Sequence, residues 1–266
     1  MSNSHGPHLA QIMSDNMMAK FAAFAERLPD FCVYRLAGIQ YVDCGLQSDT
    51  FNTVFGWPTD VDDIETVTRH YREQGNPAAW WLSGSSPETE EKLQRAGWVH
   101  EEYDVGMYLE HLVPLPGQLS AHSRVEYCDT AERFQDFGRT LSSIFEPENP
   151  VEAENVRAIY LLAGEHREEL PGDLIQIVGY ADEEPVSVAT VYLTGNVAGI
   201  FDIATPKHRR NRGFGTEIFQ QALRVAHQRG ASTCVLQASP DGLNIYRKQG
   251  FVPSGSFTVW NLPCQP

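Results

Sequence analysis

A run of cations in an acidic chain is the first feature that could do chemistry. Five of the six residues at positions 207–212 are basic, although the chain has a formal net charge of −15. They are Lys207, His208, Arg209, Arg210 and Arg212. Gly213 and Gly215 follow, where an apolar pattern with helical spacing begins. A helix N-terminus offers unpaired N–H groups and glycines let a ligand approach the backbone, so the stretch predicts a site for a small anion such as a nucleotide pyrophosphate.

Other common phosphate-binding and nucleophile patterns are missing from the sequence. The glycine-lysine loop of ATPases, which ends in Gly-Lys-Ser or Gly-Lys-Thr, does not occur. A Rossmann fingerprint would need a glycine two residues before Gly213, where Asn211 stands. The Gly-x-Ser-x-Gly motif of many hydrolases is also absent from the sequence. These observations disfavour ATPase, dinucleotide-binding and hydrolase chemistry.

The residues of the basic loop carry a family resemblance. The stretch "IATPKHRRNRGFGTEIFQQAL" resembles the coenzyme A loop of the GCN5-related N-acetyltransferases (GNAT), whose signature is Arg/Gln-x-x-Gly-x-Gly/Ala. Arg210, Gly213 and Gly215 meet that signature. The loop after Pro206 is one residue longer than the usual spacing, so Arg209 and Arg210 are both candidates for the arginine's place.

A second motif of the same family follows at the expected distance. The stretch "VLQASPDGLNIYRKQGF" is similar to the strand-helix segment that ends in Tyr-x-x-x-Gly-Phe, here Tyr246, Gly250 and Phe251. The two motifs occur in the family's order, and the resemblance covers roughly residues 122 to 266. It implies an α/β (α+β) fold of tandem GNAT-like domains, each with a central mixed, largely antiparallel sheet flanked by helices.

The resemblance also implies acetyl-CoA as the co-substrate and gives roles to named residues. Strands 196–205 and 233–238 would splay apart, which leaves backbone groups of strand 196–205 to pair with the pantetheine arm. Tyr246 resembles the general acid that protonates the departing thiolate; the alternative is a buried tyrosine that packs its helix against the sheet. Asn244 and Arg247 would bind the coenzyme or else face solvent. The residues expected to contact the coenzyme are Ile203, Ala204, Thr205, Arg210, Asn211, Arg212, Gly213, Phe214, Gly215, Thr216, Asn244 and Arg247.

Asp202 is the second candidate for a catalytic role, beside Tyr246. It interrupts the apolar run "GIFDIAT" near the place where the thioester should lie. A lone carboxylate in such a run is costly unless it is paired or functional. It could remove the proton of the attacking amine or orient a cationic acceptor. A salt bridge or a solvent-facing strand position explains it equally well.

Several helices and strands must position these residues, and turn residues separate two patterned halves. Pro114, Pro116 and Gly117 indicate a linker at 114–121, so we expect domains at 1–113 and 122–266. In the second half the patterns predict strands near 125–128, 174–180, 186–193, 196–205, 233–238 and 257–260, and helices after Asp129 or Thr130, from about Val151 and over 215–228. A short helix is expected within 241–249.

The first half resembles part of the second. Residues 86–99, "SPETEEKLQRAGWV", align without a gap to 239–252, "SPDGLNIYRKQGFV". Leu93 stands where the alignment puts Tyr246, and the acids of "PTDVDD", 58–63, replace a phosphate loop. We therefore expect a degenerate GNAT-like repeat without a coenzyme site, although two strand-turn-helix units can look alike without common origin. It would complete the acceptor pocket or pair subunits in a homodimer.

Composition limits the class of protein. Acidic residues number 35 against 20 lysines and arginines, which disfavours binding to nucleic acid or to anionic membranes. No apolar run is long enough to span a bilayer. Five cysteines without a paired spacing indicate reduced core residues in a cytoplasmic protein and no metal site. His5 and His8 are expected to lie in an inert N-terminal tail.

The sequence thus predicts an acetyl-CoA-dependent N-acyltransferase. It would transfer the acetyl group to a primary amine of a small molecule or a protein by direct attack in a ternary complex. The alternative is a non-catalytic protein that binds coenzyme A as a sensor or a scaffold. The sequence leaves the acceptor and the acyl-chain preference open.

Overall fold

The computed structural model describes residues 6–84, 86–113, 121–240 and 242–264. Contacts divide the chain into two compact units: the first holds Met1–Tyr108 and Gln237–Pro266, and the second holds Leu109–Leu236. The C-terminal segment therefore groups by its contacts with the N-terminal part of the chain. The predicted linker, 114–121, lies outside the described residues except for Ala121.

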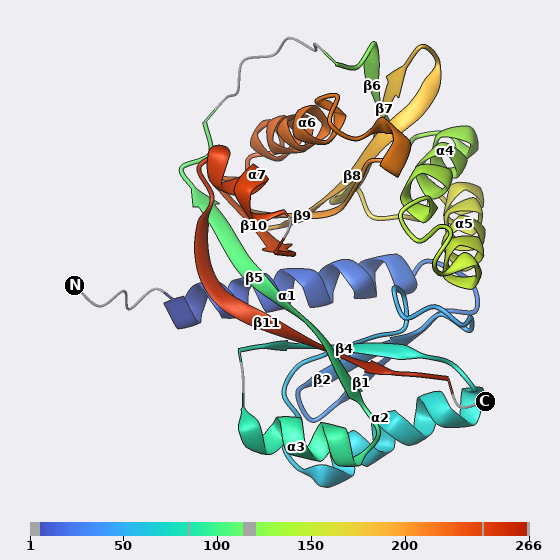
Figure 1. Cartoon of the computed structure of the whole chain (residues 1–266), viewed down its shortest axis with the longest axis vertical. Helices are drawn as coiled ribbons and strands as arrows, with labels where there is room; N and C mark the ends of the chain where they lie inside the picture. Colours follow the sequence, from blue (N-terminus) through green and yellow to red (C-terminus); the bar gives the residue numbers. More distant parts are fainter. Residues whose placement is uncertain (1–5, 85, 114–120, 241, 265–266) are drawn as a thin grey trace. The chain divides into compact units, whose positions relative to one another are not determined.

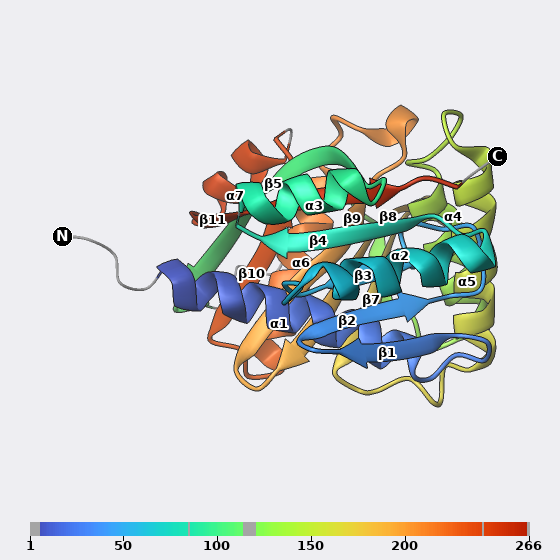
Figure 2. The ribbon, with the colours of Figure 1, turned by 90° about the horizontal axis from the view of Figure 1, so that it is seen from below.

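The first unit is built on a sheet with strand order β1-β2-β3-β4-β11-β5, in which only the β3–β4 pair among these neighbours is parallel. Helix α1 lies on one face of strands β1 to β4, and α2 and α3 lie on the other (Figures 1 and 2). Its elements are α1 (Gly6–Ala25), β1 (Cys32–Leu36), β2 (Ile39–Asp43), β3 (Thr53–Phe55), α2 (Val61–Gln74), β4 (Ala78–Ser83), α3 (Pro87–Arg95), β5 (Val99–Glu110), α7 (Leu243–Lys248) and β11 (Val252–Leu262).

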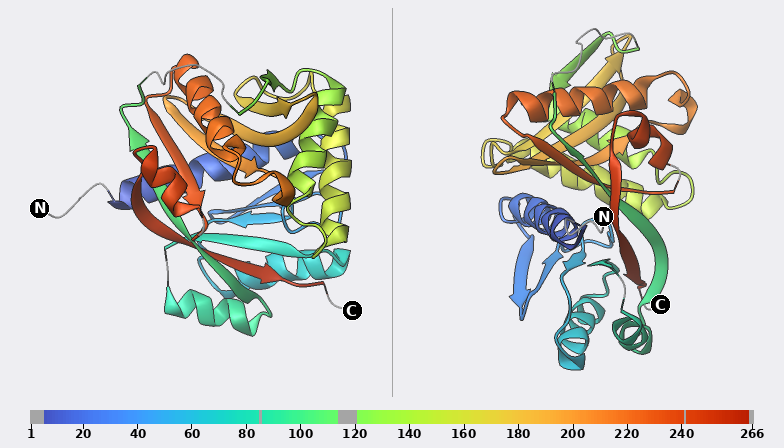
Figure 3. Two further views of the ribbon diagram at one scale, coloured as in Figure 1. Left: turned by 45° about the horizontal axis from the view of Figure 1, so that its top comes forward. Right: turned by 90° about the vertical axis from the view of Figure 1, so that its left-hand side faces the viewer.

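The second unit has strand order β10-β9-β8-β7-β6, with β10 and β9 parallel and the other neighbours antiparallel. Helix α6 crosses one face of these strands, and α4 packs beside α5 on the other (Figure 3). Its elements are β6 (Arg124–Tyr127), α4 (Ala131–Ser142), α5 (Pro150–Glu165), β7 (Leu174–Ala181), β8 (Glu184–Thr194), β9 (Val197–Ala204), the 3-10 turn η1 (Lys207–Arg209), α6 (Phe214–Gln228) and β10 (Thr233–Ala238).

The two units repeat one topology. Strands β1, β2 and β3 are antiparallel neighbours, and the fourth strand, β4, is parallel to β3. Strands β7 to β10 follow the same scheme. A long helix joins the parallel strands in each unit, α2 in the first and α6 in the second. Along the chain a short helix follows each fourth strand: α3 follows β4, and α7, which groups with the first unit, follows β10. The expected mixed, largely antiparallel sheets flanked by helices are confirmed.

Strand β11 has a position that the sequence does not indicate. It comes from the C-terminal end of the chain, yet it lies between β4 and β5 in the first unit. It pairs with β4 from Phe257 opposite Ser83 to Leu262 opposite Ala78, and with β5 along its other edge. The strand expected at 257–260 is thus the middle of a longer strand, Val252–Leu262, that completes the sheet of the first unit.

The N-terminal segment differs from the expected tail. Helix α1 begins at Gly6, so His8 lies in a helix, while His5 lies outside the described residues. The side chains of Met13, Met17 and Phe24 on this helix are buried. Their packing explains why the segment is helical although its sequence did not predict a helix. No helix in the described part of the chain has the length and apolar character to cross a membrane.

Local chemistry fixes the helix ends and the tight hairpin of the second unit. Thr130 caps α4, and Asn149 caps α5, whose first residue is Pro150. The turn between β7 and β8 places Asp182 and Glu183 at φ values of 50° and 67°. Two successive residues with positive φ form the hairpin turn whose twist matches that of the strands.

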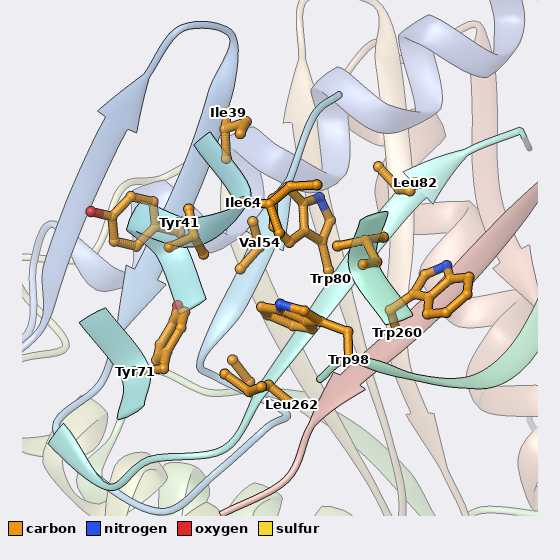
Figure 4. Close-up of a cluster of buried hydrophobic side chains, with 13 residues drawn as sticks. Ile39, Tyr41, Val54, Ile64, Tyr71, Trp80, Leu82, Trp98, Trp260 and Leu262 are labelled. Atoms are coloured by element: carbon orange, nitrogen blue, oxygen red, sulfur yellow. The ribbon is translucent and has the colours of Figure 1, made fainter. Parts of the chain in front are cut away.

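The core of the first unit is an aromatic cluster to which four strands and two helices contribute (Figure 4). Trp80 and Trp98 meet edge to face with ring centroids 5.3 Å apart. The indole N–H of Trp98 donates to Thr68 Oγ1 at 2.8 Å, and that of Trp80 donates to the carbonyl of Gly56 at 3.0 Å. Trp260 on β11 belongs to the same cluster. These tryptophans are core residues.

Removing a ring from this cluster should destabilise the protein. We expect Trp98→Ala to lower the free energy of unfolding by about 3–5 kcal/mol, because it leaves a cavity and removes the indole N–H that donates to Thr68 Oγ1. Val99→Ala is the control, because Val99 is 57% exposed while Trp98 is 1% exposed. Urea unfolding followed by circular dichroism measures both. Equal midpoints for the two variants would contradict the assigned core.

Candidate functional site

The start of α6 presents its first backbone N–H groups without a side-chain cap. The cap position is Gly213, at φ 88° and ψ −13°, and no side chain of the described residues bonds to the helix start there. The first intrahelical bond runs from Glu217 N to Gly213 O at 3.0 Å. The preceding N–H groups, on residues 214–216, are the donors that a helix leaves for an anion. The helix dipole favours a negative charge at the same place.

The basic residues beside this helix start fall into two groups. Lys207 binds Glu148, with Nζ 2.8 Å from the carboxylate, and Arg209 binds Glu184. Arg210 and Arg212 are exposed, and within the described ranges no carboxylate lies at ion-pairing distance from either. Of the two arginines that the sequence left as candidates, Arg209 is thus held by Glu184, and Arg210 is available to an anionic ligand.

The loop is folded closely against the end of β9. Arg210 Nε donates to the carbonyl of Thr205 at 3.2 Å, and Asn211 has a positive φ of 62°. A Cβ atom on Gly215 would lie 3.3 Å from Thr205 Oγ1, which is tighter than ordinary packing. A glycine at this position therefore lets the helix start approach the strand end. The predicted coenzyme residues from Thr205 to Thr216 lie on the segment that leads from the end of β9 through η1 into the start of α6.

Strand β9 is irregular where the sequence placed the reacting centre. Its parallel pairing with β10 ends at Gly199 opposite Val235. On the other edge, Asp202 and Ile203 stand opposite Ala189 alone, because the register with β8 shifts between Val188 and Thr190. Asp202 adopts a positive φ of 53°. A bulge of this kind redirects a side chain and often borders an active site.

Asp202 has a buried partner that the sequence did not reveal. The hydroxyl of Tyr160 on α5 donates to Asp202 Oδ2 at 3.5 Å. Burial first, and then the charge of Asp202, raises the pKa of Tyr160 well above its ordinary value. Tyr160 therefore stays protonated and acts as a donor. Its sequence pattern indicated only an apolar helix face, and nothing local links it to a residue 42 positions away.

Tyr246 lies on α7, in the first unit by its contacts. Its ring is tilted by 58° against that of Phe251, with centroids 6.3 Å apart. Burial and the nearby Asp104 raise the pKa of Tyr246 to about 12. The phenol is therefore protonated near neutral pH, which a proton donor requires. Asn244 and Arg247 are exposed on the same helix.

The corresponding helix in the first unit begins differently. Asp60 Oδ1 accepts from Asp63 N at 3.0 Å, and Asp63 Oδ2 accepts from Thr59 N at 2.7 Å. These carboxylates fill the start of α2, and the bond from the Thr59 hydroxyl lowers the pKa of Asp63, so its charge persists. Leu93, at the place of Tyr246, is fully buried in the aromatic core. A pyrophosphate would meet fixed negative charge there instead of N–H donors.

Other charged features of the chain are largely neutralised. A hollow of about 710 Å³ lies between α2 and α3 and is lined by four basic and two acidic residues, and two of the basic ones, Lys92 and Arg95, form ion pairs with Glu88 and Glu91. In the acidic segment 146–154, Glu146 binds Arg157 at 2.8 Å and Glu148 binds Lys207. Among the described residues, no group of three or more histidine, cysteine and acidic side chains could hold a metal ion.

Comparison with known proteins gives a family match for the stretch that includes the basic loop. Residues 138–251 match the model of the acetyltransferase (GNAT) family. The comparison with curated proteins found no match in sequence. Among solved structures, a GCN5-related N-acetyltransferase from Kribbella flavida is similar over 95% of this chain and 96% of its own, with a TM-score of 0.65 and 14% identity.

Two further structures agree on the fold. A GCN5-related N-acetyltransferase from Sphaerobacter thermophilus covers 88% of this chain and 83% of its own, with a TM-score of 0.53 and 12% identity. A tandem GNAT protein from the clavulanic acid biosynthesis pathway covers 96% of both chains, with a TM-score of 0.56 and 12% identity. At these identities the likeness establishes the fold, including its tandem form.

Gly213 should be intolerant of a side chain for reasons of backbone conformation alone. Its positive φ of 88° disfavours L-residues, while a Cβ would make only ordinary contact with Ala121 at 3.5 Å. We expect Gly213→Ala to lower the free energy of unfolding by about 1–2 kcal/mol. Gly172→Ala is the control, since Gly172 has no positive φ and a Cβ there meets nothing within 4 Å. Thermal unfolding of both would test this; an unchanged Gly213→Ala would argue against the left-handed cap.

Proposed function

We propose that the protein is an acetyl-CoA-dependent N-acetyltransferase acting on a primary amine, since residues 138–251 match the model of the acetyltransferase (GNAT) family. The observation that carries the proposal is the uncapped start of α6, with exposed Arg210 and Arg212 beside it. Helix N–H groups and two arginines suit the pyrophosphate of coenzyme A. The family match supports acyl transfer in general. That the donor is acetyl-CoA and the acceptor is a primary amine is part of our proposal.

The residues of β9 would receive the rest of the donor. Beyond Gly199, β9 has no registered partner in β10, so its backbone groups are suited to pair with the amides of a pantetheine arm. Ile203, Ala204 and Thr205 lead from that edge to the basic loop. This path would bring the thioester to the bulge at Asp202.

Asp202 and Tyr246 would carry the proton transfers. Asp202 takes a proton from the acceptor's nitrogen, directly or through water, as the nitrogen forms its bond to the acyl carbon. The carbon–sulfur bond breaks, and Tyr246 gives its proton to the departing sulfur. Tyr160 would hold the Asp202 carboxylate in place through its hydroxyl.

The first half would serve a different purpose. We propose that residues 1–113 bind no coenzyme, because the start of α2 is closed by Asp60 and Asp63. The domain at 122–266 would hold the transferase motifs. The first half would then shape the acceptor pocket or join two copies of the chain in a homodimer.

The arginine assignment can be tested in coenzyme binding. We expect Arg210→Ala to weaken acetyl-CoA binding by about tenfold to hundredfold, the range for losing one charge-assisted hydrogen bond. Arg209→Ala is the matched control, because Arg209 is already bound to Glu184, and its effect should stay within a few fold. Calorimetric titration gives both values. Absence of binding by the unaltered protein would refute the basic loop as a coenzyme site.

The catalytic assignment needs a rate measurement. In a thiol-release assay with acetyl-CoA and a panel of amines, Tyr246→Phe should lower kcat by about a hundredfold to ten-thousandfold while acetyl-CoA still binds. Asp202→Asn should lower kcat with the productive amine by a similar factor, because the amide cannot accept the proton. Tight binding without turnover on any amine would instead support the sensor or scaffold function.

A further inference from the structure

A buried polar cluster lies beneath the start of α6. It consists of His122, Ser187 on β8 and Glu217 on α6, and each of the three is less than a tenth exposed. His122 Nδ1 lies 2.7 Å from Glu217 Oε2, and His122 Nε2 lies 2.6 Å from Ser187 Oγ. The same Glu217 oxygen accepts the backbone N–H groups of Ala121 at 3.0 Å and His122 at 2.7 Å.

The protons of this cluster can be placed from its donors and acceptors. The Glu217 oxygen accepts from two backbone N–H groups, so Nδ1 of His122 carries a proton and donates to it as well. Nε2 is then the acceptor for the Ser187 hydroxyl. Burial lowers the pKa of His122 although Glu217 opposes the shift, so the imidazole is neutral near pH 7.

The cluster is arranged like a nucleophilic triad but is closed to substrates. Ser187 is fully buried in the sheet, and a Cβ on Gly179 would collide with both His122 and the Ser187 hydroxyl. A nucleophile must reach its substrate. The hydrogen bonds therefore act on the protein's own structure, and Glu217 is the member that connects them to the basic loop.

Glu217 lies on the first turn of α6, and its backbone N–H makes the first bond of that helix, to Gly213 O. The ring of Phe214, the first residue of α6, lies 5.1 Å from the His122 ring between centroids. Ala121 lies near Gly213, since a Cβ added to this glycine would be 3.5 Å from that of Ala121. The bonds to Glu217 and the ring contact with Phe214 thus join residues 121–122 to the turn that presents the N–H donors.

We propose that His122 is a positioning residue for coenzyme binding, which fixes the first turn of α6 through Glu217. The inference rests on the proposed function of the basic loop. Without the bond from Nδ1, the buried Glu217 carboxylate loses a donor, and the turn is free to shift relative to the strands. The backbone N–H groups of residues 214–216 then lose their common direction, which weakens pyrophosphate binding.

Two amide substitutions at position 122 separate the two sides of the ring. In His122→Asn the amide is attached at the γ carbon and reaches the place of Nδ1, so it can still donate to Glu217. In His122→Gln the amide reaches the place of Nε2, so the bond to Glu217 is lost. We expect the coenzyme A dissociation constant to rise at least about tenfold for His122→Gln and to stay within about threefold of wild type for His122→Asn.

Ser187→Ala is the control, because it removes the partner of Nε2 and leaves the Glu217 bonds intact. Its dissociation constant should also stay within about threefold of wild type. Calorimetric titration with coenzyme A and thermal unfolding are run on each variant. If His122→Gln is folded, melts earlier and binds coenzyme A as wild type does, the role is structural only and the inference is overturned.

A second variant tests the inference if His122→Gln does not fold. Glu217→Gln removes a negative charge near the pyrophosphate site, which by charge alone would tighten binding. Loss of the charged acceptor for three donors should nevertheless weaken coenzyme A binding, so tighter or unchanged binding overturns the inference. Failure of the wild-type protein to bind coenzyme A would refute the proposed function itself, which the wild-type titration shows separately.

Discussion

The uncapped first turn of α6 is the constraint on which the rest of the candidate site depends. Four other helices of the described chain begin with a side-chain cap, at Asp60, Ser86, Thr130 and Asn149, whereas α6 and the short α7 do not. Gly213 supplies no such group, so the donors of residues 214–216 are available only because their own chain leaves them unused. Because no side chain caps this turn, its position must be fixed by contacts with residues distant in the sequence. Glu217, bound to residues 121–122, supplies them from within the same turn.

The bulge in β9 follows the same logic at the other end of the loop. A regular strand would pair Asp202 into the ladder and turn its side chain with the pleat. The extra residue opposite Ala189 instead releases the backbone from β8 at this point, and Tyr160 contacts the Asp202 carboxylate from α5. A carboxylate in an apolar strand is costly, and this one is partly offset by a buried hydroxyl. At each end of the basic loop, an irregular backbone position is thus accompanied by a contact from a distant residue: Asp202 is contacted by Tyr160, and the turn after Gly213 is contacted by His122.

Patterns within one segment predicted the elements of the second unit closely. The helix expected at 215–228 begins at Phe214, and the strand expected at 233–238 has those bounds. Hydrophobic spacing and turn residues act over a few positions, so they are readable from sequence. The contacts of His122 with Glu217 and of Tyr160 with Asp202 join residues 95 and 42 positions apart, which no local pattern encodes. Placement of β11 beside β4 is likewise a property of the folded sheet.

The two units show how one topology can gain or lose a ligand site without losing its core. At the start of α2, Asp60 and Asp63 make a reciprocal cap, which stabilises the helix and occupies the donors. Leu93 fills the aromatic core where its counterpart Tyr246 keeps a hydroxyl. Both differences stabilise the folded first unit and remove groups that could bind a coenzyme. In the first unit, polar side chains bond to the start of α2 and stabilise the protein's own fold. In the second unit, the backbone N–H groups at the start of α6 and the nearby arginines are left for an anionic coenzyme to bind.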